Sequence, residues 1–221
     1  MKLLLSALTK FILGIVLLGM LLFIPAGSFK FTNAWIFMAI LFVPMIFLGI
    51  ILFLKAPKLL EKRLDAKEKE NSQKTVLLFS CIFFIGGFIL AGLDFRFGWS
   101  RVPKIIVIIA SAVLVISYAL YAEVMRENAY LSRTIKVEEN QTVVDTGLYK
   151  IVRHPMYAVT IWLFLSIPLV LGSWVSFLCF IPFIPLFVIR IINEEKLLEK
   201  ELKGYTEYKT QVKYRLIPFI W

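Results

Sequence analysis

The stretch RHPMYAVTIWLFLSIPLVLGSWVSFLCFIPFIPLFVIR, residues 153–190, carries formal charges only at its two terminal arginines. A transmembrane helix needs about 20 apolar residues to cross ~30 Å of hydrocarbon, so this run is too long for one span. Gly172-Ser-Trp174 interrupts it with residues that favour a turn. We therefore predict a helical hairpin with legs at Pro155–Leu171 and Val175–Ile189, whose charged ends meet at one membrane surface.

Both predicted legs are short, at roughly 25 and 22 Å for a rise of 1.5 Å per residue. Three alternatives account for them: the legs cross where the membrane is thin, extend into the charged flanks, or enter only partway. Pro168, Pro182 and Pro185 lie inside the legs and are expected to kink them, because proline removes a backbone donor.

The remainder of the chain is also typical of a membrane protein. Of its 221 residues 60% are hydrophobic, and the mean hydropathy is +0.83. Four further uncharged runs are long enough to span a bilayer: Phe11–Phe29, Phe31–Leu54, Thr75–Leu93 and Ile105–Ala122. We predict an all-α, multi-pass integral membrane protein with about six transmembrane helices. Residues 1–122 form the first four, and residues 123–221 form a functional region of loop, hairpin and C-terminal helix.

The distribution of basic residues predicts which membrane face each loop occupies, because short cytoplasmic loops are enriched in Lys and Arg. With a cytoplasmic N-terminus, the outer loops hold only Lys30, Arg96, Arg101 and Lys104, and the other Lys and Arg residues fall on the inner side. Both chain ends and the region of His154 are then cytoplasmic. Anionic membrane lipids attract such basic flanks.

Three polar segments separate the apolar runs. Residues 55–74 read as an amphipathic connector. Residues 123–153 contain β-branched and turn residues, and Thr134–Val137 and Thr142–Val144 are expected to form short strands. Residues 193–215 have helical periodicity to about Lys203, followed by a break at Gly204.

The mouth of the hairpin brings together polar residues. Pro155 suits the first position of a helix, so the preceding His154 lies at a helix N-terminus with unpaired amides. Tyr157 lies three residues further on, while Arg190 and Glu194 at the other end are four residues apart and share one helix face. Two interpretations remain open: a ligand site, or an interfacial Arg190–Glu194 ion pair with His154 as a capping residue.

Composition also excludes several site types. A single histidine cannot provide a zinc site of the usual kind, and no metal is expected. The net charge of +10 needs no nucleic-acid partner, because the basic residues flank membrane spans. Gly86-Gly87 and Gly92 lie within or beside a span and form no phosphate loop, which argues against a soluble nucleotide-binding fold.

An ordered set of motifs between Asn128 and the C-terminus resembles the isoprenylcysteine carboxyl methyltransferase family, which is related to the phospholipid methyltransferases. The motifs are Gln141-Thr-Val-Val-Asp-Thr-Gly-Leu-Tyr149, Arg153-His-Pro-Met-Tyr157, Glu194-Glu195 followed by Leu198, and Tyr205-Thr-Glu-Tyr208 ahead of Ile217-Pro218. The resemblance implies that residues 123–221 are the methyltransferase region.

This resemblance also implies a cofactor and a site. S-adenosylmethionine would be held by Gln141, Thr142, Val143, Val144, Tyr149, His154, Pro155, Met156, Tyr157 and Glu194. Arg190 would meet the substrate, and Arg190 with Glu194 would form the catalytic pair.

The acceptor group would decide the substrate class. A carboxylate needs no general base and suits the cation of Arg190, whereas a lipid amine must lose a proton to a base such as His154 or Glu194. We expect carboxyl O-methylation of a lipidated or lipophilic molecule that enters from the bilayer. The alternatives are a phospholipid or other amphiphile methyltransferase, and a noncatalytic transporter or scaffold.

Overall fold

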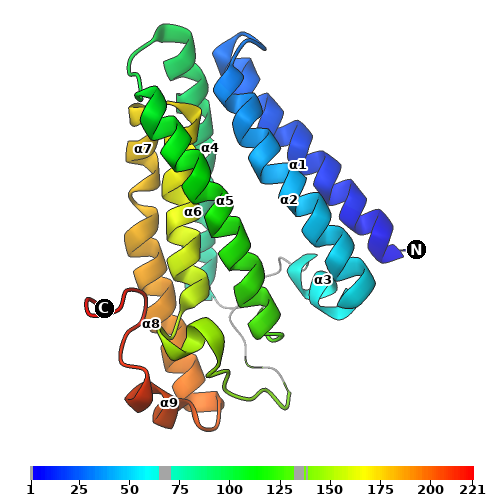
Figure 1. The fold of residues 1–221 in the computed structure, drawn as a ribbon, viewed down its shortest axis with the longest axis vertical. Helices are drawn as coiled ribbons and strands as arrows, with labels where there is room; N and C mark the ends of the chain where they lie inside the picture. The colour runs from blue at the N-terminus through cyan, green and yellow to red at the C-terminus, as the bar shows by residue number, and fades with distance from the viewer. Residues whose placement is uncertain (1, 65–70, 132–136, 138) are drawn as a thin grey trace.

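All regular elements in the part of the chain that the computed structural model describes, residues 2–64, 71–131, 137 and 139–221, are helices (Figure 1). In chain order they are α1 (Lys2–Ala26), α2 (Thr32–Lys55), α3 (Pro57–Leu64), α4 (Asn71–Phe97), α5 (Lys104–Glu127), the 3-10 turn η1 (Gly147–Lys150), α6 (Pro155–Leu171), α7 (Trp174–Phe180), α8 (Phe183–Glu201) and α9 (Tyr205–Gln211). The predicted all-α fold is confirmed.

Five stretches are long and apolar enough to cross a membrane: α1, α2, the apolar part of α4, α5, and the combined α7 and α8. The 17-residue α6 is a shorter apolar helix. Together they give the integral membrane architecture that the hydropathy predicts, with six apolar segments.

The first helix begins and ends earlier than the uncharged run predicted. Helix α1 begins at Lys2 and ends at Ala26, whereas the uncharged run extends from Phe11 to Phe29. Lys10 lies inside the helix and does not end it. Its long side chain extends away from the helix axis, and its Nζ donates a hydrogen bond to the Leu64 carbonyl at 2.7 Å.

The predicted hairpin turn is confirmed. Helix α6 ends at Leu171, and Gly172 follows with φ 82°, a left-handed conformation that glycine adopts without steric cost. Of the three prolines, only Pro182 coincides with a break, between α7 and α8. The second leg extends into the charged flank, since α8 continues to Glu201.

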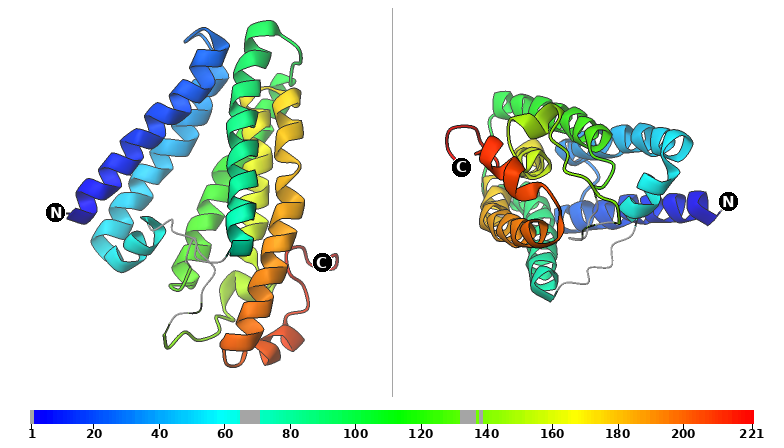
Figure 2. Two further views of the ribbon diagram at one scale, coloured as in Figure 1. Left: turned by 180° about the vertical axis from the view of Figure 1, so that it is seen from behind. Right: turned by 90° about the horizontal axis from the view of Figure 1, so that it is seen from below.

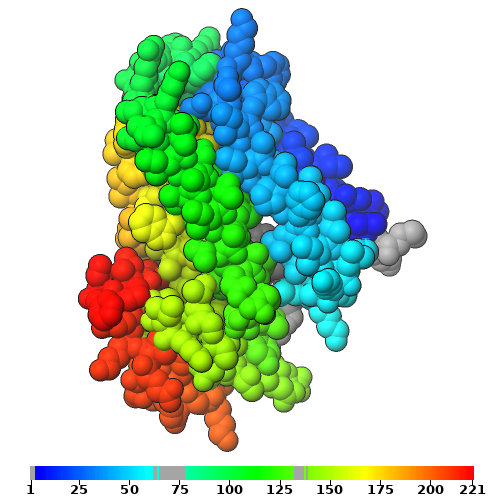
Figure 3. Space-filling view, viewed as in Figure 1, coloured from blue at the N-terminus to red at the C-terminus, as the bar shows by residue number. Residues whose placement is uncertain are grey.

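Helices α1 and α2 meet the other helices at one end of the molecule and diverge from them toward the other end, where α3, α9 and both chain termini lie (Figures 1 and 2). Helix α1 packs on α4, and α5 packs on α6. Gly92 allows the close approach of α4 to α1, because a Cβ there would lie 2.6 Å from the Leu22 carbonyl oxygen. The space-filling view shows the notch that this divergence leaves between α2 and α5 (Figure 3).

A buried polar cluster joins the helices at the converging end. Asp94 on α4 accepts hydrogen bonds from the backbone amide of Ser100 at 2.7 Å and from the hydroxyls of Ser100 and Ser173. Ser173 in turn accepts from the amide of Ser176 at 2.9 Å and caps α7. These contacts tie the α4–α5 loop to the hairpin turn.

The predicted polar segments are partly confirmed. Helix α3 begins the connector of residues 55–74, although residues 65–70 lie outside the described chain. The predicted break at Gly204 is present between α8 and α9. The strand expected at Thr142–Val144 is wrong, and most of the one at Thr134–Val137 lies outside the described residues. Val143 instead packs against the buried side chains in and around α9. This contact stabilises the irregular loop that contains Val143.

Candidate active site

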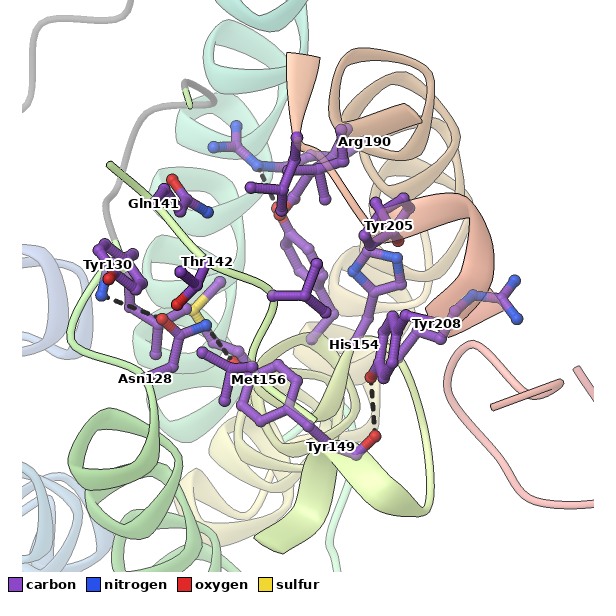
Figure 4. A pocket seen from close by; sticks show the side chains of 18 residues that line it. Asn128, Tyr130, Gln141, Thr142, Tyr149, His154, Met156, Arg190, Tyr205 and Tyr208 are labelled. Carbon is purple, nitrogen blue, oxygen red and sulfur yellow. Dashed lines mark hydrogen bonds between the residues drawn. The ribbon is translucent and has the colours of Figure 1, made fainter. Parts of the chain in front are cut away.

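A cavity opens at the diverging end, between the loop after α5, the start of α6, the end of α8, and α9 (Figure 4). Its described lining comprises Asn128, Tyr130, Leu131, Gln141, Thr142, Val143, Val144, Tyr149, Arg153, His154, Met156, Tyr157, Arg190, Glu194, Leu198, Leu202, Tyr205 and Tyr208. Segments up to 80 positions apart, from Asn128 to Tyr208, therefore converge on one site.

The site residues implied by the family resemblance lie together in this cavity, with the exception of Pro155. Pro155 is buried and is the first residue of α6, where its fixed φ favours the start of the helix. His154 occupies the N-cap position, but its side chain makes no capping hydrogen bond. Its ring nitrogen Nε2 faces Glu195 instead.

Tyr157 connects the two residues that were expected to share a face of α8. Its hydroxyl donates to Glu194 Oε2 at 2.5 Å and accepts from Arg190 Nε at 3.0 Å. Tyr157 and Arg190 are buried, whereas Glu194 is partly exposed. The three side chains thus form a hydrogen-bonded row across the cavity wall, and the predicted common face is confirmed.

Glu195 is the central acidic residue that the sequence did not reveal as part of the site. It is only 3% exposed. Its Oε1 lies 2.7 Å from Arg153 Nε and 3.2 Å from His154 Nε2, and its Oε2 lies 2.8 Å from Arg215 Nε. A buried carboxylate is tolerated only with such compensation, so Glu195 holds Arg153 and His154 in place at the cavity floor.

The C-terminal strap, residues 212–221, secures the same point. The Arg153 amide donates to the Tyr214 carbonyl and the His154 amide to the Arg215 carbonyl, each at 2.9 Å. The Arg153 guanidinium also donates from Nη1 to the carbonyls of Val212 and Lys213, at 2.7 and 2.9 Å. Backbone groups that precede α6 are therefore fixed by the far end of the chain.

Tyr149, on η1, anchors the loop that forms the opposite wall. Asn128 Nδ2 donates to the Tyr149 hydroxyl at 3.0 Å, and Asn128 Oδ1 accepts from the Tyr130 amide at 3.0 Å. Tyr208 donates its hydroxyl proton to the Tyr149 carbonyl at 2.7 Å (Figure 4). This wall is thereby attached both to α5 and to α9.

Tyr205 and Tyr208 are cavity residues to which the sequence assigned no role, although their Tyr-x-x-Tyr spacing after Gly204 belonged to the motif set. Both are buried. Burial raises the pKa of the Tyr205 phenol, and the negative charges of Glu195 and Glu194 raise it further. Tyr205 is therefore a neutral hydrogen-bond donor at neutral pH.

The cavity combines aromatic faces, side-chain amides, carboxylates and guanidinium groups. Such a mixture suits a ligand that has an aromatic part and both charge signs. Residues 104–204 match the family model of the phospholipid methyltransferases. The match covers 101 of the 221 residues, slightly less than half of the chain.

The matched region runs from the first residue of α5 to Gly204 and includes all of the lining except Tyr205 and Tyr208. The C-terminal strap also lies beyond it. A comparison with curated proteins gave no significant match.

Proposed function

We propose that the protein is an S-adenosylmethionine-dependent methyltransferase that methylates the carboxylate of a lipidated or lipophilic molecule, such as an isoprenylcysteine. The observation that carries this proposal is the hydrogen-bonded row Arg190–Tyr157–Glu194 on the wall of a cavity whose lining falls mostly within the region that matches the methyltransferase family model. The row places a cation and a carboxylate four residues apart on the wall of one site.

The chemistry of the lining fits the cofactor. Carboxylates such as Glu194 accept bonds from an ammonium or from ribose hydroxyls, and the amides of Asn128 and Gln141 complement the edge of a purine. Tyr149 offers an aromatic face to the purine or to the sulfonium. When bound, the cofactor supplies a methyl group on a positively charged sulfur.

Arg190 is the residue proposed to select an acidic substrate. A guanidinium clamps a carboxylate in a two-point geometry, and the bond from Nε to the Tyr157 hydroxyl fixes its orientation. A carboxylate acceptor needs no proton removed, so the protein contributes positioning and a suitable electrostatic environment. Tyr157 is in this view a positioning residue for Arg190.

A phospholipid amine is the second candidate substrate, and the family match favours it. An amine must lose its proton to a base. Neither candidate base is reserved for this step, because Nε2 of His154 faces Glu195 and Glu194 is assigned to the cofactor in this proposal. This arrangement favours the carboxylate over the amine.

We place the site on the cytoplasmic side, where the basic residues of the chain are concentrated and where the polar cofactor is made available. The apolar tail of the substrate would enter from the bilayer between the diverging helices, and no nucleic acid or metal takes part.

Transfer of a radiolabelled methyl group tests the proposal. Purified protein in lipid nanodiscs receives labelled cofactor with either a prenylcysteine analogue or phosphatidylethanolamine. We expect a base-labile methyl ester on the prenylcysteine analogue. A label that appears only on the phospholipid would establish the second candidate. Saturable cofactor binding without transfer to either acceptor or to a lipid extract would leave a noncatalytic binding protein.

A further inference from the structure

The Tyr205 hydroxyl is the one buried side-chain polar atom without a hydrogen-bond partner in the described part of the chain. Tyr205 is the first residue of α9 and is only 4% exposed. Buried hydroxyls are ordinarily satisfied, as those of Tyr157 and Tyr208 are in this protein. An unsatisfied buried donor costs free energy, so this one requires an explanation.

The surroundings of this hydroxyl point to a ligand. Tyr205 lines the cavity on the same side as His154 (Figure 4). The charges of Glu195, Glu194 and Arg153 all influence the pKa of this phenol, so the hydroxyl lies near the charged centre of the site. Because the phenol is neutral at neutral pH, it can donate one hydrogen bond to an incoming acceptor.

Tyr205 faces the negative charges of Glu195 and Glu194 and the positive charge of Arg153, so the acceptor that it can meet depends on how far these carboxylates are neutralised by their own partners. Glu195 is paired with the two guanidinium groups of Arg153 and Arg215, so this cluster has one more formal positive charge than negative, even with His154 neutral. Glu194, in contrast, belongs to the row with Tyr157. An acidic group is thus favoured at the Glu195 cluster, and a basic group beside Glu194.

We propose that Tyr205 Oη donates a hydrogen bond to the carboxylate of the amino-acid end of bound S-adenosylmethionine, while Glu194 receives the ammonium of the same end. This inference rests on the proposed function and assigns an end of the cofactor to a part of the cavity. The unsatisfied donor is the feature that the bound carboxylate completes.

The test compares Tyr205→Phe with the parent protein in nanodiscs, by thermophoresis with S-adenosylmethionine and with its decarboxylated analogue. The analogue keeps the ammonium and lacks only the carboxylate. We expect Tyr205→Phe to bind S-adenosylmethionine about tenfold more weakly, since a hydrogen bond to a charged group is lost. Affinity for the decarboxylated analogue should stay within about twofold of the parent.

Thermal unfolding without ligand provides the second readout. Tyr205→Phe removes an unsatisfied hydroxyl, so the unfolding temperature of the ligand-free protein should not fall. Tyr208→Phe is the matched control, because its hydroxyl donates to the Tyr149 carbonyl at 2.7 Å and its loss should lower that temperature.

Three outcomes would overturn the assignment: unchanged affinity of Tyr205→Phe for S-adenosylmethionine, an equal loss for both ligands, or a fall in stability equal to that of Tyr208→Phe. If the folded parent protein binds neither ligand, the proposed function itself is refuted, which separates its failure from that of the Tyr205 contact.

Discussion

Replacing Glu195 by glutamine tests whether the buried charge cluster holds the site together. The substitution keeps the size of the side chain but leaves Arg153 without its counter-ion, with both side chains about 5% exposed or less. Breaking a buried ion pair in this way costs about 3–5 kcal/mol. For a chain of this length, 1 kcal/mol shifts the unfolding temperature by roughly 2–4 °C, so we expect a fall of roughly 6–20 °C.

The contribution of Arg215 should be smaller. Its side chain is 30% exposed, so solvent screens its bond to Glu195 and limits that contribution to about 1 kcal/mol. Its guanidinium also lies 5.0 Å from the centre of the Trp221 ring, an interaction that adds about 0.5–1 kcal/mol. Arg215→Ala should therefore lower the unfolding temperature by at most about 8 °C.

The assay is thermal unfolding in nanodiscs, followed by tryptophan fluorescence. Glu199→Gln is the matched control, because Glu199 lies on the same helix and is exposed, with Lys209 as its partner. Surface substitutions of this kind change stability by about 0.5 kcal/mol or less. If Glu195→Gln unfolds at the temperature of Glu199→Gln, the buried ion pairs of Glu195 do not stabilise the protein, contrary to this prediction.

Three further outcomes are expected. Tyr157→Phe should reduce methyl transfer about tenfold or more, because one lost hydroxyl removes a hydrogen bond from both Arg190 and Glu194; unchanged transfer would contradict the positioning role. Arg190→Ala should raise the substrate concentration needed for half-maximal rate and leave cofactor affinity nearly unchanged. Glu194→Ala should instead weaken cofactor binding. If both variants weaken cofactor binding equally, Arg190 only orients Glu194. Single cysteines are introduced at Glu139 and at Trp99, which are both exposed. A membrane-impermeant maleimide should label position 139 from the cytoplasmic side and position 99 from the opposite side. A reversed pattern would contradict the proposed sidedness.

Hydropathy predicted the membrane fold because each span is a local property of the chain. The hairpin turn was equally local, since Gly172 marks it in the sequence. The ends of the first helix were harder to predict. Lys10 interrupts the apolar run, yet α1 continues past Lys10, whose side chain bonds to the Leu64 carbonyl. Helix ends depend on such tertiary contacts as well as on composition.

The site was predicted only as far as motif resemblance reached. Arg190 and Glu194 share a face by spacing alone, but their link through Tyr157 depends on how α6 packs against α8. The Glu195 cluster joins positions 153, 195 and 215, whose meeting no local pattern encodes. Spacing from Arg190 singled out Glu194, which lines the cavity, but gave no sign that the adjacent Glu195 is buried and pairs with two arginines.

The C-terminal strap has a consequence for synthesis on the ribosome. Chains are made from the N-terminus, so α1, α2, α4 and α5 are synthesised before any described cavity residue. The carbonyls of residues 212–215 that hold Arg153 and His154 are made after every residue of the cavity lining. A nascent chain thus acquires its membrane anchor first and its fixed binding site last, and it stays unable to organise that site until translation has passed residue 215.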